Sequence, residues 1–79
     1  MTTKETDYVK RLFRFLGRLN KIEILQKSNL SDYEIELLTK RFVNQLSLKD
    51  CADYFNIEAN TVSKQQLKAV KKLYSYLSQ

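Results

Sequence analysis

The sequence predicts an all-α domain of four helices, because of its composition and its helix-start signals. Of its 79 residues, 43% are hydrophobic and 29% are charged, a balance that favours a folded domain over a disordered chain. One glycine and no proline leave few residues for tight β-turns. Two serines stand where helices typically begin, so we expect helices joined by short links within a single domain, residues 1–79.

The N-terminal segment, residues 1–29, is expected to form a basic amphipathic helix over residues 6–27 that packs on the rest of the chain. Thr6 is the candidate N-cap. At about 100° per residue, the expected apolar stripe consists of Tyr8, Leu12, Phe15, Leu16, Leu19 and Ile22. The opposite stripe consists of Lys10, Arg11, Arg14, Arg18 and Lys21. Gly17 weakens the helix by about 1 kcal/mol relative to alanine, which is compatible with a bend or with close packing there.

Two further helices are expected to begin at serine caps. Ser31 and Glu34 have the spacing of a capping box, so a second helix is expected over residues 31–43. Its expected buried side consists of Ile35, Leu38 and Phe42, with Leu37 close by. A third, short helix is expected over residues 47–55, which again open with a serine. Asn56 is the best turn signal after it, because asparagine tolerates a left-handed backbone.

The last expected helix begins near residue 59 and separates apolar from polar side chains. Its apolar side consists of Val62, Ala69, Val70, Leu73 and Leu77. Its polar side consists of Asn60, Thr61, Lys64, Lys68, Lys71 and Lys72. This division predicts one buried face and one basic face available to a partner.

Residues 48–73 have the anatomy of a helix-turn-helix, in which a short helix and a turn precede a longer helix that enters the major groove. Ala52 is expected where the two helices approach most closely, and Val62 is expected to be the first buried residue of the second helix. Cys51 is expected to be a small core residue. The alternative is a generic helical hairpin, because other motifs also join two short helices.

The stretch LSDYEIELLTKRFVNQLSLKDCADYFNIEANTVSKQQLKAVKKL, residues 30–73, resembles the C-terminal promoter-binding region of sigma-70-type factors. The resemblance rests on three features, which are an acid-rich helix ending in Arg-Phe, a short helix with a central alanine and a long helix closing with Lys-Lys-Leu. Two positions differ in the turn, where Asn56 replaces the usual glycine and Glu58 replaces the usual serine or threonine cap. In the long helix, Gln65 or Gln66 stands where the family commonly has an apolar residue.

The resemblance implies a helix-turn-helix unit over residues 30–79 and a function in sequence-specific regulation of transcription. Nothing in the chain resembles the other sigma regions, so it implies a stand-alone regulator or an accessory protein, such as a phage or another mobile element encodes. The implied partners are double-stranded DNA and RNA polymerase or another transcription protein.

The groove-facing positions of the family correspond here to Asn60, Thr61, Lys64, Gln65 and Lys68. Asparagine and glutamine can pair with adenine, and lysine can donate to guanine, with about 1–3 kcal/mol of discrimination for each pair. Thr61, near the helix start, is suited to a phosphate. Lys71 and Lys72 lie further along the helix and are expected either to contact phosphates or to remain solvated near its C-terminal dipole.

Positive charge is concentrated in two blocks of a chain whose formal charge is +5. Residues 10–27 carry six bases against one acid, and residues 59–79 carry four lysines and no acid, whereas the middle of the chain is acidic. Such blocks favour a polyanionic partner. Arg11, Arg14 and Arg18 are therefore candidate phosphate contacts, although a solvated surface is the alternative for this stripe.

The aromatic residues near both ends exceed what a small core requires. Phe13, Tyr74, Tyr76 and Leu77 are candidate residues of a homodimer interface, because helix-turn-helix proteins commonly dimerise to contact two half-sites. The alternative is that these side chains pack the first helix onto the last.

No enzyme is expected, because the chain contains no histidine, one cysteine and no glycine-rich phosphate loop. No metal and no cofactor are expected either. No apolar run approaches the roughly 20 residues that span a bilayer, so a cytoplasmic protein without membrane contact is expected. The alternative function is a protein-interaction module that uses a sigma-like fold to bind RNA polymerase, a regulator or a mobile-element antagonist, which Glu58 and the acidic middle favour.

Overall fold

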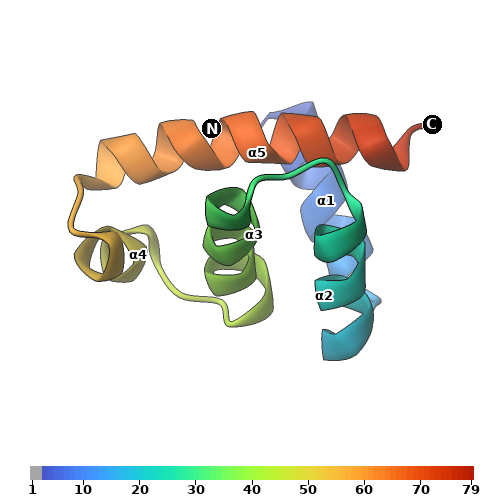
Figure 1. Cartoon of the computed structure of the whole chain (residues 1–79), viewed down its shortest axis with the longest axis horizontal. Coiled ribbons are helices and arrows are strands. Elements are labelled where there is room, and N and C mark those ends of the chain that lie inside the picture. Colours follow the sequence, from blue (N-terminus) through green and yellow to red (C-terminus); the bar gives the residue numbers. More distant parts are fainter. Residues whose placement is uncertain (1–2) are drawn as a thin grey trace.

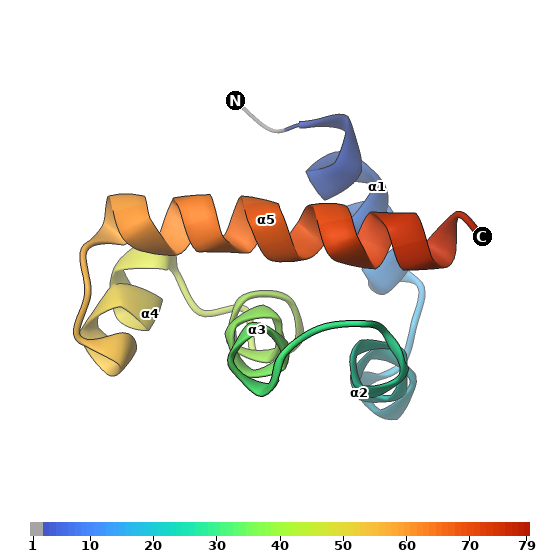
Figure 2. The same ribbon diagram turned by 45° about the horizontal axis from the view of Figure 1, so that its top comes forward.

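The computed structural model describes residues 3–79, which are all-helical and contain no strand, so the all-α prediction is confirmed. In chain order the elements are α1 (Lys4–Arg14), α2 (Arg18–Lys27), α3 (Asp32–Leu38), the π-helical segment η1 (Thr39–Val43), α4 (Leu48–Phe55) and α5 (Ala59–Leu77). The long helix α5 extends across a row formed by α4, α3 and α2, and α1 crosses α5 (Figures 1 and 2). The radius of gyration of 11.6 Å is that of a compact chain.

The predicted helix over residues 6–27 is wrong, because the chain forms two helices there. Gly17 has extended backbone, with φ −72° and ψ 165°, and stands at the N-cap of α2. Apart from Gly17 itself and its two chain neighbours, no residue has a heavy atom within 4 Å of the position that a Cβ of Gly17 would take, so close packing is not the cause. The low helix propensity of glycine is the local reason for a break here.

The break also overturns part of the predicted apolar stripe, of which Leu12 and Leu16 still pack against the hydrophobic core whereas Tyr8 is 44% exposed. Phe15 and Leu19 are 84% and 80% exposed, whereas Val9 and Phe13 of α1 and Leu25 of α2 are buried. The 100° periodicity applies only within a continuous helix, so each of the two helices turns its own face inward.

The N-cap of α1 is Thr3 rather than the predicted Thr6. The Thr3 hydroxyl oxygen accepts a hydrogen bond of 3.1 Å from the backbone N–H of Thr6, and Thr6 itself is buried in the first turn of the helix. A threonine therefore caps the helix as predicted in kind, but it is the threonine three positions earlier.

The predicted capping box at the start of α3 is confirmed, with both of its hydrogen bonds between Ser31 and Glu34 present. The helical path ends at Val43, as predicted, but its last turn is π-helical. The backbone N–H of Asn44 donates to the carbonyl of Thr39 over 2.9 Å, five residues back.

Two hydrophobic clusters form the interior. The main core consists of Val9, Phe13, Leu25, Leu38, Phe42, Ala69, Val70 and Leu73. The small core consists of Leu37, Cys51, Ala52 and Val62. The helices α3 and α5 contribute to both clusters, and the predicted core position of Cys51 is confirmed.

The predicted signals around α4 are confirmed. The Ser47 hydroxyl accepts a hydrogen bond of 3.0 Å from the backbone N–H of Asp50, which caps the helix start. Asn56 ends α4 in the left-handed conformation, with φ 58° and ψ 47°. The predicted apolar face of α5 is buried except for Leu77, which is half-buried, and Gln66 is buried with that face.

Replacement of Asn56 by alanine is expected to lower the free energy of unfolding by about 1 kcal/mol, because an alanine Cβ crowds the backbone in the left-handed region. Asn56→Gly is expected to cause no such loss. Urea unfolding followed by circular dichroism measures both variants, and Asn29→Ala is the matched control, because Asn29 is exposed and its φ is not positive. Wild-type stability of Asn56→Ala would contradict the left-handed cap.

Candidate nucleic-acid interface

One side of α5 presents polar and basic side chains to solvent. Asn60, Lys64, Lys68 and Lys71 are exposed and share the side opposite the buried residues of the helix. Thr61 lies beside them and is half-buried. Among the residues that the structure describes, none of these three lysines lies in an ion pair, so their charges are available to a partner.

Two of the predicted contact residues instead face α3. The Tyr33 hydroxyl donates to Oε1 of Gln65, and Lys72 Nζ lies 3.1 Å from Oε1 of Glu34. The polar side of α5 that is open to a partner is therefore smaller than predicted, because Gln65 and Lys72 are bound to side chains of α3.

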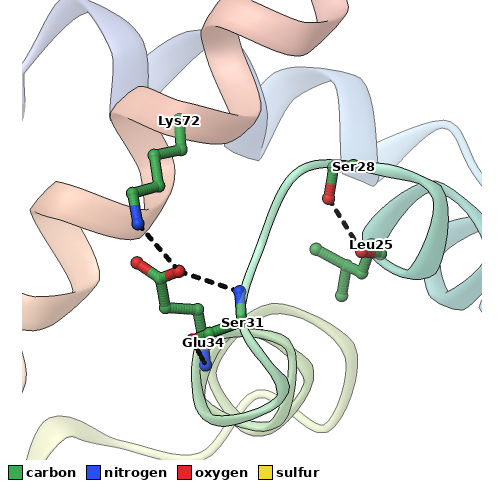
Figure 3. A network of polar contacts seen from close by, with 5 residues as sticks. All are labelled: Leu25, Ser28, Ser31, Glu34 and Lys72. Atoms are coloured by element: carbon green, nitrogen blue, oxygen red, sulfur yellow. Dashed lines mark hydrogen bonds and ion pairs between the residues drawn. The ribbon is translucent and has the colours of Figure 1, made fainter.

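Glu34 is the centre of this contact between α3 and α5. Its Oε1 accepts hydrogen bonds from Lys72 Nζ and from the backbone N–H of Ser31, the latter over 3.0 Å (Figure 3). Burial alone would raise the pKa of Glu34, but the hydrogen bonds from Ser31 and the charge of Lys72 outweigh burial and lower this pKa below its usual value. The carboxylate therefore stays ionised and fixes Lys72 in place.

The three arginines predicted to contact phosphates have different surroundings. Arg11 pairs with Asp7 of its own helix at 3.3 Å, and Arg18 donates to Oδ1 of Asn44 over 3.1 Å. Arg14 lines a surface hollow of about 200 Å³ between α1, α2 and η1. The three arginines therefore do not form one continuous basic surface, because the break at Gly17 places Arg18 on a different helix from Arg11 and Arg14.

A second hollow, of about 320 Å³, lies between α1, η1, the start of α4 and α5. Lys10 and Arg41 line both hollows, and Lys64 lines the second. Sequence reasoning did not single out Arg41, because nothing local marks it and only the fold brings it beside α1 and α5. The nearest signal was the Arg-Phe pair at the end of the acid-rich helix, which contains this residue.

Arg41 is held in place by neutral groups. Its Nε donates to Oε1 of the buried Gln66 over 2.6 Å, and one terminal nitrogen donates to the carbonyl of Leu46 over 2.5 Å. Gln66 is thus the glutamine at the apolar position, and its amide oxygen accepts this hydrogen bond from the guanidinium. The pair fixes a positive charge at the wall between the two hollows.

Three of the four predicted interface residues lie in or against the main core. Phe13 is 2% exposed and packs edge to face against Phe42, with the ring centres 6.2 Å apart, so it is a core residue. Tyr74 packs in the same manner on Tyr8, with the ring centres 5.1 Å apart. Tyr76 and Leu77 are half-buried against the main core. The contact between Tyr8 and Tyr74 packs α1 onto α5, which was the alternative expectation, and the contact between Phe13 and Phe42 packs α1 onto η1.

Glu58 stands at the N-cap of α5 with extended backbone, and its side chain makes no capping hydrogen bond. The side chain is exposed, so its carboxylate lies at the start of the helix that carries the lysines.

Cys51 is fully buried in the small core, and burial raises the pKa of its thiol.

Within residues 3–79, no three histidine, cysteine or acidic side chains are grouped as metal ligands. No helix in this part of the chain has both the length and the apolar character needed to cross a bilayer. Comparison with protein-family models, curated proteins and solved structures finds no match.

Proposed function

We propose that the chain is a helix-turn-helix protein that binds specific DNA sites and regulates transcription, with α5 inserted in the major groove. The observation that carries the proposal is the exposed, unpaired polar side of α5. At 1.5 Å per residue this helix is about 28 Å long, and an α-helix fits the major groove of B-DNA.

The arrangement of α4 and α5 supports this proposal. Asn56 ends α4, three residues form the turn between the helices, and α5 begins at Ala59. Ala52 and Val62 are both buried in the small core, where α4 packs on α5. Because α4 packs on the buried side of α5, it leaves the exposed side of α5 open to a partner.

Each exposed residue has a role in the proposed complex. Asn60, Lys64 and Lys68 are placed to contact base edges, because asparagine pairs with adenine and lysine donates to guanine. Thr61 and Lys71 bind phosphates. Gln65 and Lys72 remain bound to α3 and support the orientation of α5 rather than contacting DNA.

Removal of Lys68 tests the proposal. In a salt-titrated binding assay on selected and random duplexes, Lys68→Ala is expected to weaken binding to the selected duplex by about 5-fold or more, as the loss of a base contact worth about 1–3 kcal/mol requires. The control is Lys27→Ala, which removes the same charge from the exposed last residue of α2, outside the proposed contact residues. If no duplex binds below about 100 μM, the weak limit of non-specific binding, DNA binding is overturned.

A second candidate function is a protein-interaction module for RNA polymerase or another transcription protein. The exposed Phe15 and Leu19 favour it, because they flank the corner between α1 and α2 next to Arg14 and Arg18. An apolar pair bordered by arginines suits an acidic protein surface. In that case Phe15→Ala would abolish binding to the partner, whereas Lys68→Ala would not.

A further inference from the structure

We propose that a basic groove beside α5 binds phosphate groups and holds the DNA backbone next to the bases that α5 contacts; this inference rests on the proposed function. The basic groove comprises the two adjoining hollows, which share Lys10 and Arg41. Its cationic side chains are Lys10, Arg14, Lys21, Arg41 and Lys64.

The groove contains cations without counter-charges. No acidic residue lines either hollow. In the described part of the chain, Arg11, Lys27 and Lys72 form ion pairs, whereas no cation of the groove does. Five positive groups from four elements therefore converge on a surface with no internal anion, and their mutual repulsion is relieved by an anionic ligand.

Arg41 gives the groove a fixed charge. The residue is half-buried, and its hydrogen bonds go to the neutral oxygens of Gln66 and Leu46. These acceptors satisfy N–H groups and orient the guanidinium, but they carry no negative charge to neutralise it. A guanidinium that is already oriented loses little entropy on binding a phosphate, which it recognises through its planar set of donors.

The size and position of the groove suit a DNA strand. Its hollows, of about 200 and 320 Å³, are several times the roughly 30 Å³ of a water molecule and can admit phosphate groups. Lys64 belongs both to the groove and to the exposed side of α5. A strand whose bases meet α5 can therefore continue past Lys64 toward Lys10 and Lys21, which lengthens the contacted site.

The first test measures the salt dependence of duplex binding. The variant Lys10→Gln/Lys21→Gln leaves the hydrogen bonds of Arg41 intact, and its control Lys4→Gln/Lys27→Gln removes the same charge outside the groove. The log–log slope of affinity against salt is expected to decrease by about 0.9 for each phosphate that the protein no longer neutralises, so by nearly two units in the groove variant only. The ratio of selected to random duplex affinity is expected to stay unchanged. An unchanged slope with normal duplex binding overturns the groove and leaves the role of α5 intact.

The second test uses tripolyphosphate and needs no duplex. Titration of the wild-type protein is expected to shift the amide resonances of Lys10, Arg41 and Lys64 in NMR spectra, and the groove variant is expected to reduce these shifts. Absence of shifts overturns phosphate binding by the groove. Equal shifts with polyglutamate would identify a general polyanion site and overturn the assignment to phosphate. If no duplex binds at all, both the proposed function and the groove's role on DNA fail, whatever tripolyphosphate does.

Discussion

Replacement of Leu73 by alanine is expected to remove a large part of the stability of the protein. Leu73 is 0% exposed and lies in the main core, where residues of α1, α2, α3, η1 and α5 meet. Leucine-to-alanine changes at such positions cost about 2–5 kcal/mol, and the total stability of a small domain is about 5–15 kcal/mol. A shift of the urea midpoint, followed by circular dichroism, measures the loss.

Leu19→Ala is the matched control for this substitution. Leu19 is 80% exposed, so the same chemical change is expected to alter the free energy of unfolding by less than about 0.5 kcal/mol. A loss below about 1 kcal/mol for Leu73→Ala would contradict the position of α5 over the main core.

Glu34→Gln is expected to reduce stability at neutral pH and to lose its effect in acid. Glutamine can still accept from the Ser31 backbone N–H, as in other capping boxes, but it loses the charge that holds Lys72. Loss of a charge-assisted hydrogen bond by a side chain that is nearly buried costs about 1–3 kcal/mol. Glu34→Ala is expected to cost more, because it also leaves that N–H without its acceptor.

The pH dependence follows from the lowered pKa of Glu34. A carboxyl group whose pKa is lower in the folded state stabilises the fold above its unfolded-state value of about 4.5, and this stabilisation is lost as pH falls through the lowered pKa. The difference in urea midpoint between wild type and Glu34→Gln should therefore shrink from pH 7 to pH 3. A difference that is undiminished at pH 3 would show that the ionised carboxylate is not the stabilising group. Glu23→Gln, which breaks an exposed ion pair, is the control and should have a smaller effect at pH 7.

The sequence predicted best those features that depend on a few neighbouring residues. The capping box of Ser31 and Glu34, the cap at Ser47 and the left-handed Asn56 were all located correctly, because each is a local hydrogen bond or backbone preference. The buried face of α5 was also predicted, since an uninterrupted helix keeps its periodicity over its whole length.

The features that the sequence did not predict depend on the path of the chain. The apolar stripe failed at Phe15 and Leu19 because a single glycine changed the direction of the helix, and periodicity carries no information across such a break. The groove was not foreseen for a similar reason. Lys10 and Arg41 are 31 positions apart, and only the packing of α1 against η1 and α5 brings them to one surface.

Two adjacent leucines of α3 lie in different cores, and this couples the unfolding of the main core to that of the small core. Leu37 packs in the small core and Leu38 in the main core, so α3 cannot unfold without opening both clusters. Thermal melting should therefore be a single transition, and a ligand on either surface should raise its midpoint. A duplex at 100 times its Kd adds about 2.7 kcal/mol, which corresponds to roughly 10–20 °C for a chain of this size. The melting temperature of the unlabelled protein thus offers a direct screen for a DNA sequence of the kind that the proposed function requires.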